Sequence, residues 1–466
     1  MRDGSGPTAG DATEVVLIDA LSDPAVRSPG AAAAVLTELI TSGDLPVGTR
    51  LPTIRSLSQK TGLSTRTVVG VWAELRGSGL VETNRRGGTV VLGARPQAYP
   101  ADRKATAPDR LEDRDLLTGS PDYELQPDLT AALIAGLATD ELHHPGRDYI
   151  TDRLRSAVVA GWPFDAKAFV AAGGGSEGLL LAVEAAAPAG SLIAVEEPII
   201  PGFLDTLTEV GYRVVGIASD ERGASPDALA EVVRDGPAAV VLQPEGAYSD
   251  LGALTDDRAA ELAEVLDAAP TSPWIVEDDA VGPLATSQAP SLGRWFPDRS
   301  VRVRSYCKAY GMDIKTCVIG GSAQLVDRAI HIRVHGIAAN SRILQNGLAH
   351  LVADDAANDV VEVARERYAA RRRSLVAALR ERAVPAAAGP NSLVVWADVQ
   401  DETGALVALA QRGILVGAGS RSFPGAGRQP RLRIAVPQLP DDPVTLAALA
   451  DAIAAEATGV HREFLE

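Results

Sequence analysis

The feature that most constrains this chain is a regular alternation of short apolar runs with helical segments between residues 166 and 324. The apolar runs contain AKAFVAAG, SLIAVEEP, RVVGIAS, AAVVLQP, PWIVEDDA, VRVRSYCK and TCVIGGSAQ. Segments with helical periodicity, such as DDRAAELAEVLDAA, lie between them. Strands that alternate with helices form a mainly parallel sheet with helices on both faces. The pattern therefore predicts an α/β fold for this part of the chain.

A different pattern precedes the sheet and predicts three helices followed by two strands. Apolar residues recur at helical intervals before Ser42, and the stretch TIRSLSQKTG predicts a second helix that ends at Gly62. Ser64 is a suitable N-cap for a third helix, STRTVVGVWAELRG. The segments LVETN and TVVLG alternate like strands and are joined by a basic tip, RRGG. This order is that of a winged helix-turn-helix domain.

The charge of this front segment favours contact with a polyanion. The whole chain carries a net charge of −17, yet residues 31–95 hold eight Lys and Arg against four Asp and Glu. In a helix-turn-helix domain, the N-terminal residues of the last helix enter the major groove. The predicted DNA contacts are Arg55, Ser64, Thr65, Arg66, Thr67, Arg86 and Gly88. The alternative is a small helical interaction domain with a solvated arginine face.

The same segment resembles the winged-helix domain of GntR-type regulators. The stretch SGDLPVGTRLPTIRSLSQKTGLSTRTVVGVWAELRGSGLVE contains a Leu-Pro pair followed by Arg55, a hydroxyl-rich helix start and a final Gly-Leu segment. The family usually places arginine directly after the serine, whereas here Thr65 stands between Ser64 and Arg66. This difference bears on base preference rather than on DNA binding itself.

Several residues of the α/β region have the chemistry that pyridoxal 5'-phosphate requires. The cofactor needs a lysine amine, a carboxylate for its ring nitrogen and backbone N–H groups for its phosphate. Lys308 follows the strand-like VRVRSY, and Asp278 ends WIVEDD. The glycine turn GGGSEG offers the amides of Ser176 and Glu177, and Ser305 and Lys315 could add phosphate donors. Each signal alone is weak, because such side chains are usually solvated, but their order along an α/β region strengthens the hypothesis.

Residues 116–460 resemble the fold-type I aminotransferase domain, and with the front segment the chain resembles a MocR-type regulator. The matching motifs are DLLTGSPDYELQP, VEEPIIPGF, VEDDAVGPL and SYCKAYGMDIKTCVIGG. The resemblance implies that Lys308 forms the aldimine with the cofactor, that Asp278 pairs with the pyridinium nitrogen and that Ser176 and Glu177 form the phosphate loop. It also implies that Arg433, in RLRIAVP, clamps the carboxylate of an amino-acid-like effector through a bidentate fork. Arg431 is a second candidate for this clamp.

The sequence departs from the family pattern at several positions that contact the cofactor. Ile200 replaces an aromatic residue that stacks on the ring, Ala280 replaces a tyrosine, and Lys315 replaces a phosphate-binding arginine. The loop QPEGAYSDLGALT lacks the usual Asn or His, and Tyr248 is a candidate substitute. Three functions stay open: a regulator that senses through the cofactor, a regulator that has lost it and senses a metabolite directly, and an aminotransferase with a vestigial DNA-binding domain. The missing ring contacts favour sensing over turnover.

The predicted organisation is a small winged helix-turn-helix domain joined to a large aminotransferase-like α/β domain. The expected divisions are a flexible N-terminal segment at 1–29, the DNA-binding domain at 30–92, a linker at 93–115 and the large domain at 116–466, with a small subdomain from about 345. The expected partners are a double-stranded DNA operator, a small effector and a second copy of the chain. No run of 18 apolar residues and no secretory signal is present, and two cysteines form neither a disulfide framework nor a zinc site. The sequence therefore favours a cytoplasmic protein without membrane or metal.

Overall fold

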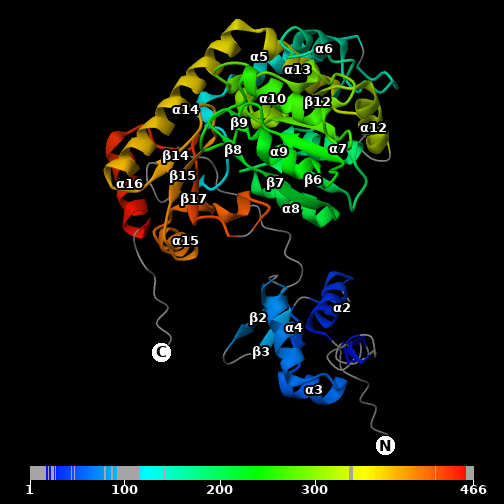
Figure 1. Cartoon of the computed structure of the whole chain (residues 1–466), viewed down its shortest axis with the longest axis vertical. Coiled ribbons are helices and arrows are strands. Elements are labelled where there is room, and N and C mark those ends of the chain that lie inside the picture. Colours follow the sequence, from blue (N-terminus) through cyan, green and yellow to red (C-terminus); the bar gives the residue numbers. More distant parts are fainter. Residues whose placement is uncertain are drawn as a thin grey trace, which may run out of the picture. The chain divides into compact units, whose positions relative to one another are not determined.

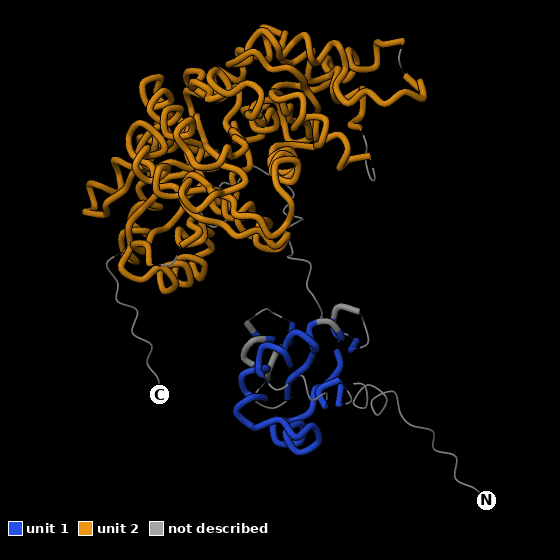
Figure 2. Tube along the Cα trace, turned by 45° about the vertical axis from the view of Figure 1, so that its right-hand side comes forward, with its two compact units in different colours: residues 1–106 blue, residues 107–466 orange. Residues whose placement is uncertain are grey.

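The chain divides into two compact units, residues 1–106 and residues 107–466 (Figure 2). The computed structural model describes residues 17–18, 20–22, 26, 28–42, 45–46, 48–77, 80–84, 88–91, 115–140, 142–334, 339–425 and 427–457. Apart from Asp115, the predicted linker at 93–115 lies outside these residues. Among the described residues, no helix is long and apolar enough to cross a bilayer.

Unit 1 has the three helices and the wing that the sequence predicts. Its helices are α2 (Pro29–Ser42), α3 (Ile54–Thr61) and α4 (Thr65–Gly77). Its sheet has the order β1-β3-β2, with all neighbours antiparallel, and consists of β1 (Arg50–Leu51), β2 (Val81–Asn84) and β3 (Gly88–Val91). The strands β2 and β3 form the predicted hairpin, so the winged helix-turn-helix prediction is confirmed.

Local signals explain where the helices of unit 1 begin and end. The Thr53 hydroxyl accepts the Ser56 N–H (3.2 Å) before α3, and Gly62 ends this helix in the left-handed region at φ 73°. The core that holds the helices together also includes Leu17 and Leu21, which are fully buried. Both leucines belong to the segment 1–29, which the sequence predicts to be flexible. The prediction is corrected at these two positions, because their burial stabilises the fold.

The main sheet of unit 2 has seven strands in the order β5-β13-β12-β11-β10-β6-β7 (Figure 1). The strands are β5 (Ala168–Ala172), β6 (Leu192–Glu196), β7 (Arg213–Ile217), β10 (Ala239–Leu242), β11 (Trp274–Asp279), β12 (Ser300–Ser305) and β13 (Cys317–Gly321). From β12 to β7 all neighbours are parallel, whereas β13 pairs antiparallel with both β12 and β5. The sheet is therefore mainly parallel, as predicted.

Helices cover both faces of this sheet. On β11, Val276 packs in an apolar layer with Leu179 of α7, whereas its neighbour Ile275 packs in a second layer with Leu262 of α10. Successive residues of a strand point to opposite faces, so both faces of the sheet are apolar and buried. The helices of this part are α5 (Leu129–Leu137), α6 (Asp152–Val159), α7 (Gly175–Ala186), α8 (Pro201–Val210), α9 (Pro226–Val233), α10 (Asp256–Asp267), α11 (Cys307–Tyr310), α12 (Ala323–Val334) and α13 (Arg342–Ala353).

A second sheet of five strands forms the smaller part of unit 2, in the order β14-β15-β17-β16-β4. Its elements are β4 (Asp115–Leu116), β14 (Ala386–Ala387), β15 (Val394–Asp398), β16 (Leu415–Ala418) and β17 (Arg431–Ala435), with helices α14 (Asp355–Glu381), α15 (Glu402–Gln411) and α16 (Pro443–Ala457). Its edge strand β4 pairs with β16, more than 290 residues later in the chain. The small subdomain predicted from about 345 therefore also includes residues 115–116. The helix α13, which spans position 345, packs against α5 and α6 of the larger part.

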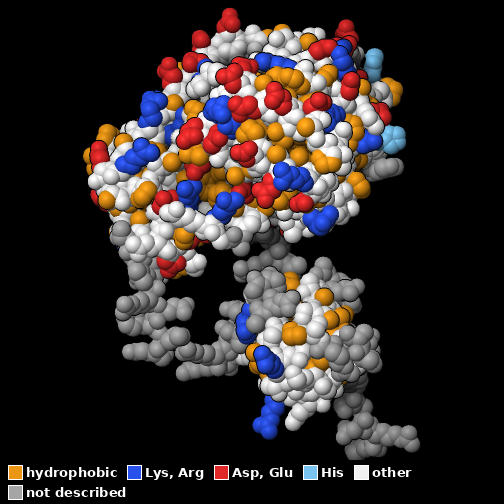
Figure 3. Space-filling view, viewed as in Figure 1, with side chains coloured by type: hydrophobic (Ala, Val, Ile, Leu, Met, Phe, Trp, Pro, Cys, Tyr) orange, Lys and Arg blue, Asp and Glu red, His pale blue; other side chains and the backbone are white. Residues whose placement is uncertain are grey.

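The remaining elements of unit 2 are short. They are the hairpin β8 (Ser219–Asp220) and β9 (Gly223–Ala224), and the single turns η2 (Tyr123–Leu125), η3 (Gly282–Leu284), η4 (Leu292–Arg294), η5 (Met312–Ile314) and η6 (Ser420–Ser422). Acidic and basic side chains are interspersed over the visible face of unit 2 (Figure 3). No large field of one sign dominates that face, so the chemistry of the unit is decided by its buried groups.

Candidate functional site

The predicted DNA-reading residues of unit 1 lie at the start of α4. Thr65 and Arg66 are exposed, while Thr67 is half-buried. The Ser64 hydroxyl accepts the Thr67 N–H (3.0 Å) and bonds the Thr67 hydroxyl (2.7 Å). Ser64 is thus the N-cap that the sequence predicts, and it fixes the first turn of the helix with Arg66 in solvent.

The other predicted contacts of unit 1 lie on α3 and on the wing. Arg55 is exposed in the first turn of α3. Gly88 is exposed at the start of β3 with φ 80°, a backbone conformation that favours glycine. Arg86 lies outside the described residues. Lys and Arg side chains are visible at the surface of unit 1 (Figure 3).

In unit 2, Lys308 lies just beyond the carboxyl end of β12, in the one-turn helix α11. Its side chain is half-buried, and desolvation lowers the pKa of its amine, an effect that the nearby Asp278 carboxylate partly offsets. Gly119 belongs to the motif TGSPD, and a Cβ built on it would lie 4.0 Å from Lys308 Cε. The Gln126 amide donates to the Lys308 carbonyl (3.2 Å). The segment around residues 119–126 therefore packs directly over the lysine.

Asp278 lies at the carboxyl end of β11, next to the strand that leads to Lys308. Its side chain is 4% exposed, and desolvation raises the pKa of its carboxyl to about 7, with Lys308 pulling the other way. In the register of the two strands, Asp278 is opposite Val303. Asp278 and Lys308 therefore both lie at the carboxyl ends of adjacent parallel strands, where ligands bind in such sheets.

The glycine turn before α7 lies beside Ser305. The helix begins at Gly175, and a Cβ added to this glycine would lie 3.1 Å from the Ser305 hydroxyl. Ser305 itself is buried, whereas Ser176 in the first turn of α7 is exposed. The first N–H groups of a helix have no partner within the helix, so this turn and the Ser305 hydroxyl beside it offer donors of the kind that bind a phosphate.

Glu177 has a second role that the sequence did not reveal. Its carboxylate accepts the Gly173 N–H (3.1 Å) and pairs with the Arg333 guanidinium (3.3 Å). Arg333, on α12, is buried and also donates to the Ala171 carbonyl (2.7 Å). The Glu177 side chain thus fixes the shape of the glycine turn. No local signal could identify Arg333, because it lies more than 150 residues away from Glu177 in the chain.

Tyr248 and Arg433 form a second buried polar pair. Desolvation raises the pKa of the Tyr248 hydroxyl to about 12, with Arg433 opposing the shift and Asp278 adding to it. Arg433 is 8% exposed, and its Nε has no hydrogen-bond partner among the described residues. Desolvation lowers the pKa of its guanidinium, an effect that Tyr248 partly offsets. A buried guanidinium without a carboxylate partner is costly, and a ligand carboxylate would relieve that cost.

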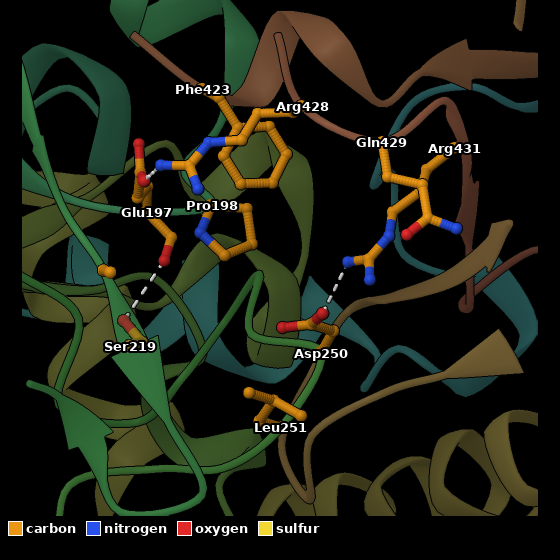
Figure 4. A pocket seen from close by; sticks show the side chains of 10 residues that line it. Glu197, Pro198, Ser219, Asp250, Leu251, Phe423, Arg428, Gln429 and Arg431 are labelled. Atoms are coloured by element: carbon orange, nitrogen blue, oxygen red, sulfur yellow. Dashed lines mark hydrogen bonds and ion pairs between the residues drawn. The ribbon is translucent and has the colours of Figure 1, made fainter. Parts of the chain in front are cut away.

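Arg431, the second candidate for the clamp, is already paired. Its guanidinium contacts Asp250 (2.6 Å) and Asp398 (2.9 Å). It lines a cavity of about 240 Å³ together with Asp250, Glu197, Arg428 and other residues, in which Arg428 also pairs with Glu197 (Figure 4). Both arginines that line this cavity thus have carboxylate partners, whereas Arg433 forms no ion pair with a carboxylate among the described residues.

The comparisons with known proteins agree with both units. Residues 95–453 match the family described as aminotransferase class I and II, and residues 30–91 match that described as bacterial regulatory proteins, gntR family. The kynurenine aminotransferase of Pyrococcus horikoshii shares the fold, with a TM-score of 0.65 and 17% identity over 75% of this chain and 93% of its own. The vitamin B6 salvage pathway transcriptional repressor PtsJ of Salmonella typhimurium is 26% identical over 88% of this chain and 94% of its own length. The chain belongs to the MocR-type regulators of the GntR family.

A second MocR-type relative, like PtsJ, is named as a transcriptional regulator. The pyridoxine biosynthesis transcriptional regulator PdxR of Corynebacterium glutamicum is 28% identical over 58% of this chain and 61% of its own length. The present chain, as a MocR-type protein, is a DNA-binding transcriptional regulator whose large domain has the fold-type I aminotransferase fold. Pyridoxal 5'-phosphate is the cofactor that this domain implies.

The residues of this MocR-type domain fit the cofactor. The half-buried amine of Lys308 has a lowered pKa, Asp278 is a buried carboxyl, and Gly175 stands so close to Ser305 that a Cβ there would lie 3.1 Å from its hydroxyl. The departures from the family pattern are also in place: Ile200 is half-buried at the start of α8, and Lys315 is exposed with φ 38°. Candidate groups for the carbonyl, the ring nitrogen and the phosphate are therefore present, whereas Ile200 offers no aromatic ring.

Proposed function

We propose that the large domain of this regulator senses a small amino-acid-like effector through pyridoxal 5'-phosphate bound at Lys308. The observation that carries the proposal is the buried Arg433 guanidinium, which has no acidic partner among the described residues and lies within electrostatic reach of Tyr248. Tyr248 in turn senses the charge of Asp278. Tyr248 therefore neighbours both the candidate carboxylate clamp, Arg433, and the candidate cofactor acid, Asp278. This arrangement supports a ligand that carries a carboxylate close to an amine, as an amino acid does.

The roles of the individual residues follow from their environments. Burial keeps a larger fraction of Lys308 neutral, as attack on a carbonyl requires. Asp278 would hold the ring nitrogen, which keeps the cofactor electron-withdrawing. The amides at the start of α7, including that of Ser176, and the hydroxyl of Ser305 would hold the phosphate. The side chain of Glu177 would shape that turn, and Lys315 would add charge from the exterior.

In unit 1, Arg66 would read a guanine through its fork, and the exposed hydroxyl of Thr65 would contact phosphate or a base edge. Arg55, together with Arg86 and Gly88 of the wing, would approach the backbone or the minor groove. We infer that two chains act together as a homodimer in the cytoplasm, so that two winged helices bind two half-sites. The effector then regulates only if it binds the two arrangements of these domains with different affinity.

Titration with pyridoxal 5'-phosphate tests the proposal. The purified protein should gain a visible absorbance band that is absent in Lys308→Ala, and amino acids should change that band and the affinity for operator DNA together. Arg433→Gln should weaken the amino-acid response roughly 10- to 100-fold without changing cofactor binding. Arg431→Gln is the matched control, since it removes an arginine that is already paired. A chain with no cofactor band, whose DNA affinity still responds to a metabolite, would contradict the proposal and support direct sensing.

A second candidate is that pyridoxal 5'-phosphate itself is the signal. It is favoured by the names of PtsJ and PdxR, which refer to vitamin B6 salvage and pyridoxine biosynthesis. On this hypothesis the cofactor alone shifts the affinity for operator DNA, and amino acids add nothing. Measuring DNA retardation with cofactor, with amino acid and with both separates the two candidates, and repeated conversion of an amino acid to a keto acid would instead support an aminotransferase.

A further inference from the structure

A buried ionic network adjoins the candidate cofactor residues in the main sheet. We call it the Arg302 cluster; it consists of Arg302, Arg304, Glu245, Glu277 and Asp279. The guanidinium of Arg302 is fully buried and contacts Glu245 Oε1 (2.7 Å), Glu277 Oε2 (3.2 Å) and Asp279 Oδ2 (3.0 Å). Arg304 contacts Asp279 Oδ2 as well (2.6 Å). One guanidinium thus joins two carboxylates of β11, Glu277 and Asp279, to a third, Glu245, from the loop after β10.

The members of the cluster lie next to the proposed site residues in the sequence. Glu277 and Asp279 flank Asp278 on β11, and in the strand register they are opposite Arg302 and Arg304 of β12. Successive residues of a strand point to opposite faces, so the cluster occupies one face of the sheet and Asp278 the other. The cluster therefore links the end of β11, which carries Asp278, to the end of β12, which leads to Lys308, on the sheet face opposite to Asp278.

The third strand end is tied in through Glu245. This residue follows β10 and precedes Tyr248 by three positions. Its carboxylate accepts the Arg302 guanidinium and also the Ala289 N–H (3.0 Å). Arg302 thus joins the ends of β10, β11 and β12, from which Tyr248, Asp278 and Lys308 respectively extend.

The cluster has more carboxylates than guanidinium groups, with three against two. Glu277 is fully bonded, since it also accepts the Ser291 hydroxyl (2.7 Å) and the Leu292 N–H (2.7 Å). Glu245 is not, because its Oε2 has no hydrogen-bond partner among the described residues. Desolvation raises the pKa of Glu245 to about 7, Asp279 adds to the shift, and Arg302 and Arg304 oppose it. Burial raises the pKa of Glu277 as well, but Glu245 is the carboxylate of the cluster with an unbonded oxygen among the described residues.

The charges of the cluster act on the cofactor acid. Asp279 raises the pKa of Asp278 and Arg302 lowers it, while Lys308 faces Asp278 from α11 and Tyr248 from the loop after β10. A buried charge is tolerated only when it is paired and well bonded, so the cluster costs free energy unless its geometry is maintained. A buried network of this kind on the strands of a sheet fixes position and charge, and it contributes little to net stability.

We propose that Arg302 and Glu245 are positioning residues for the candidate cofactor site: Arg302 holds the ends of β10, β11 and β12 in register, and the charge on Glu245 acts on Asp278 through Arg302 and Asp279, which interact with both. This inference rests on the proposed binding of pyridoxal 5'-phosphate by unit 2. None of the five residues has to touch the cofactor. Their effect is transmitted by Tyr248, Asp278 and Lys308.

Two substitutions separate charge from geometry. Glu245→Gln keeps the shape of the side chain and removes its charge. Removal of a negative charge disfavours protonation nearby, so the pH midpoint of the bound-cofactor absorbance should fall by about half a pH unit to one unit. Arg302→Lys keeps the charge and loses the three-way fork, so it should weaken cofactor affinity about 10-fold or more with a smaller change in the midpoint.

Glu261→Gln is the matched control. Glu261 also contacts a buried guanidinium, that of Arg258 (2.9 Å), but in a cluster that does not border the proposed pocket residues in the chain. The control should keep both the affinity and the pH midpoint of the wild type, and calorimetry checks that all variants fold. If Arg302→Lys does not fold, Glu245→Gln decides alone.

The outcomes distinguish the inference from the function on which it rests. A Glu245→Gln variant with the wild-type pH midpoint overturns the inference while leaving cofactor binding intact. An equal shift in Glu261→Gln also overturns it, because the effect would then be general. A wild-type chain without any cofactor absorbance overturns the proposed function, and the inference with it.

Discussion

The two units of this regulator place their functional residues in opposite ways. In unit 1, Thr65 and Arg66 are exposed at the start of α4. The first turn of this helix is fixed by a hydrogen bond from the Thr67 N–H to the Ser64 hydroxyl. In unit 2, Asp278 of β11 and Lys308 of α11, which follows β12, are both desolvated. The first arrangement depends on local hydrogen bonds, whereas the second depends on the packing of a whole sheet.

This difference has consequences for how each unit tolerates change. An exposed contact residue contributes little to the stability of its own fold, so its loss should affect binding alone. A desolvated charge raises the free energy of the folded state, so a site built from such groups trades stability for chemistry. Substitutions in unit 1 and unit 2 should therefore differ in kind, and the following experiments test that expectation.

The largest effect is expected for Lys308→Ala. The substitution removes the amine that would bond pyridoxal 5'-phosphate, so the visible absorbance should vanish and affinity should fall roughly 1000-fold or more. Because unit 1 carries its own contacts, the affinity for operator DNA without effector should stay within about twofold of the wild type. Absorbance titration and DNA retardation on the same sample measure both.

Lys315→Ala is the control for that experiment, because Lys315 belongs to the same motif but is exposed. It should weaken cofactor binding about 10-fold at most, since an exposed ammonium contributes only a screened charge. Equal losses in the two variants would contradict the distinction between desolvated and exposed groups.

A smaller effect, on stability, is expected for Asp278→Asn in the cofactor-free protein. Desolvation raises the folded-state pKa of Asp278 from 3.8 to about 7. The folded state therefore binds this proton more tightly than the unfolded state, and the stability that the proton provides is lost as pH rises through about 7. The neutral Asn should make unit 2 more stable than the wild type by roughly 2–4 kcal/mol at pH 8, and the gain should disappear below about pH 4.

Calorimetry of the cofactor-free protein at pH 4, 6 and 8 measures this difference. Asp256→Asn is a suitable control, because Asp256 is exposed and pairs with the exposed Arg294. A gain in stability that is the same at every pH would show that Asp278 is not held in a desolvated site.

The third effect concerns DNA and should leave unit 2 unchanged. Arg66→Ala should cost about 1–3 kcal/mol of operator affinity, the usual contribution of an arginine fork to a guanine. Arg66→Lys keeps the phosphate attraction and loses the fork, so its affinity for unrelated DNA should be retained while specificity falls. Loss of cofactor absorbance in either variant would break the proposed independence of the two units.

The same contrast explains what the sequence could predict. The cap at Ser64 and the end of α3 at Gly62 depend on residues within one helical turn, and both predictions are confirmed. The grouping of the glycine turn, Asp278 and Lys308 could also be predicted from their order in the sequence, because a parallel sheet brings the ends of its strands together. The choice between Arg431 and Arg433 was not, since it depends on Asp250 and Asp398, which lie far from β17 in the sequence.

Other features of unit 2 escaped prediction for the same physical reason. The strand β4 joins a sheet formed almost 300 residues later, and Glu177 is bonded by Arg333 from another helix. Charged residues in the strand-like stretches VRVRS and WIVEDD were a signal of the Arg302 cluster, because charge within a buried strand requires a partner. The sequence shows that such a partner is needed, but only the register identifies it.

The smallest effect is expected for Ser64→Ala, and it tests the local character of unit 1 most directly. The substitution removes the hydroxyl that accepts the Thr67 N–H, which should cost unit 1 about 1 kcal/mol of stability. Since the same turn presents Arg66, operator affinity should also fall, by about two- to fivefold, because a frayed turn must be ordered on binding. Ser64→Asp is the matched variant: it restores the cap, so stability should recover, but its charge near DNA phosphates should keep affinity low. Chemical unfolding monitored by Trp72 fluorescence, with DNA retardation beside it, separates the two readouts. If Ser64→Ala instead lowered the stability of unit 2, or altered cofactor absorbance, the cap would be part of a wider network and unit 1 would not be the locally determined domain described above.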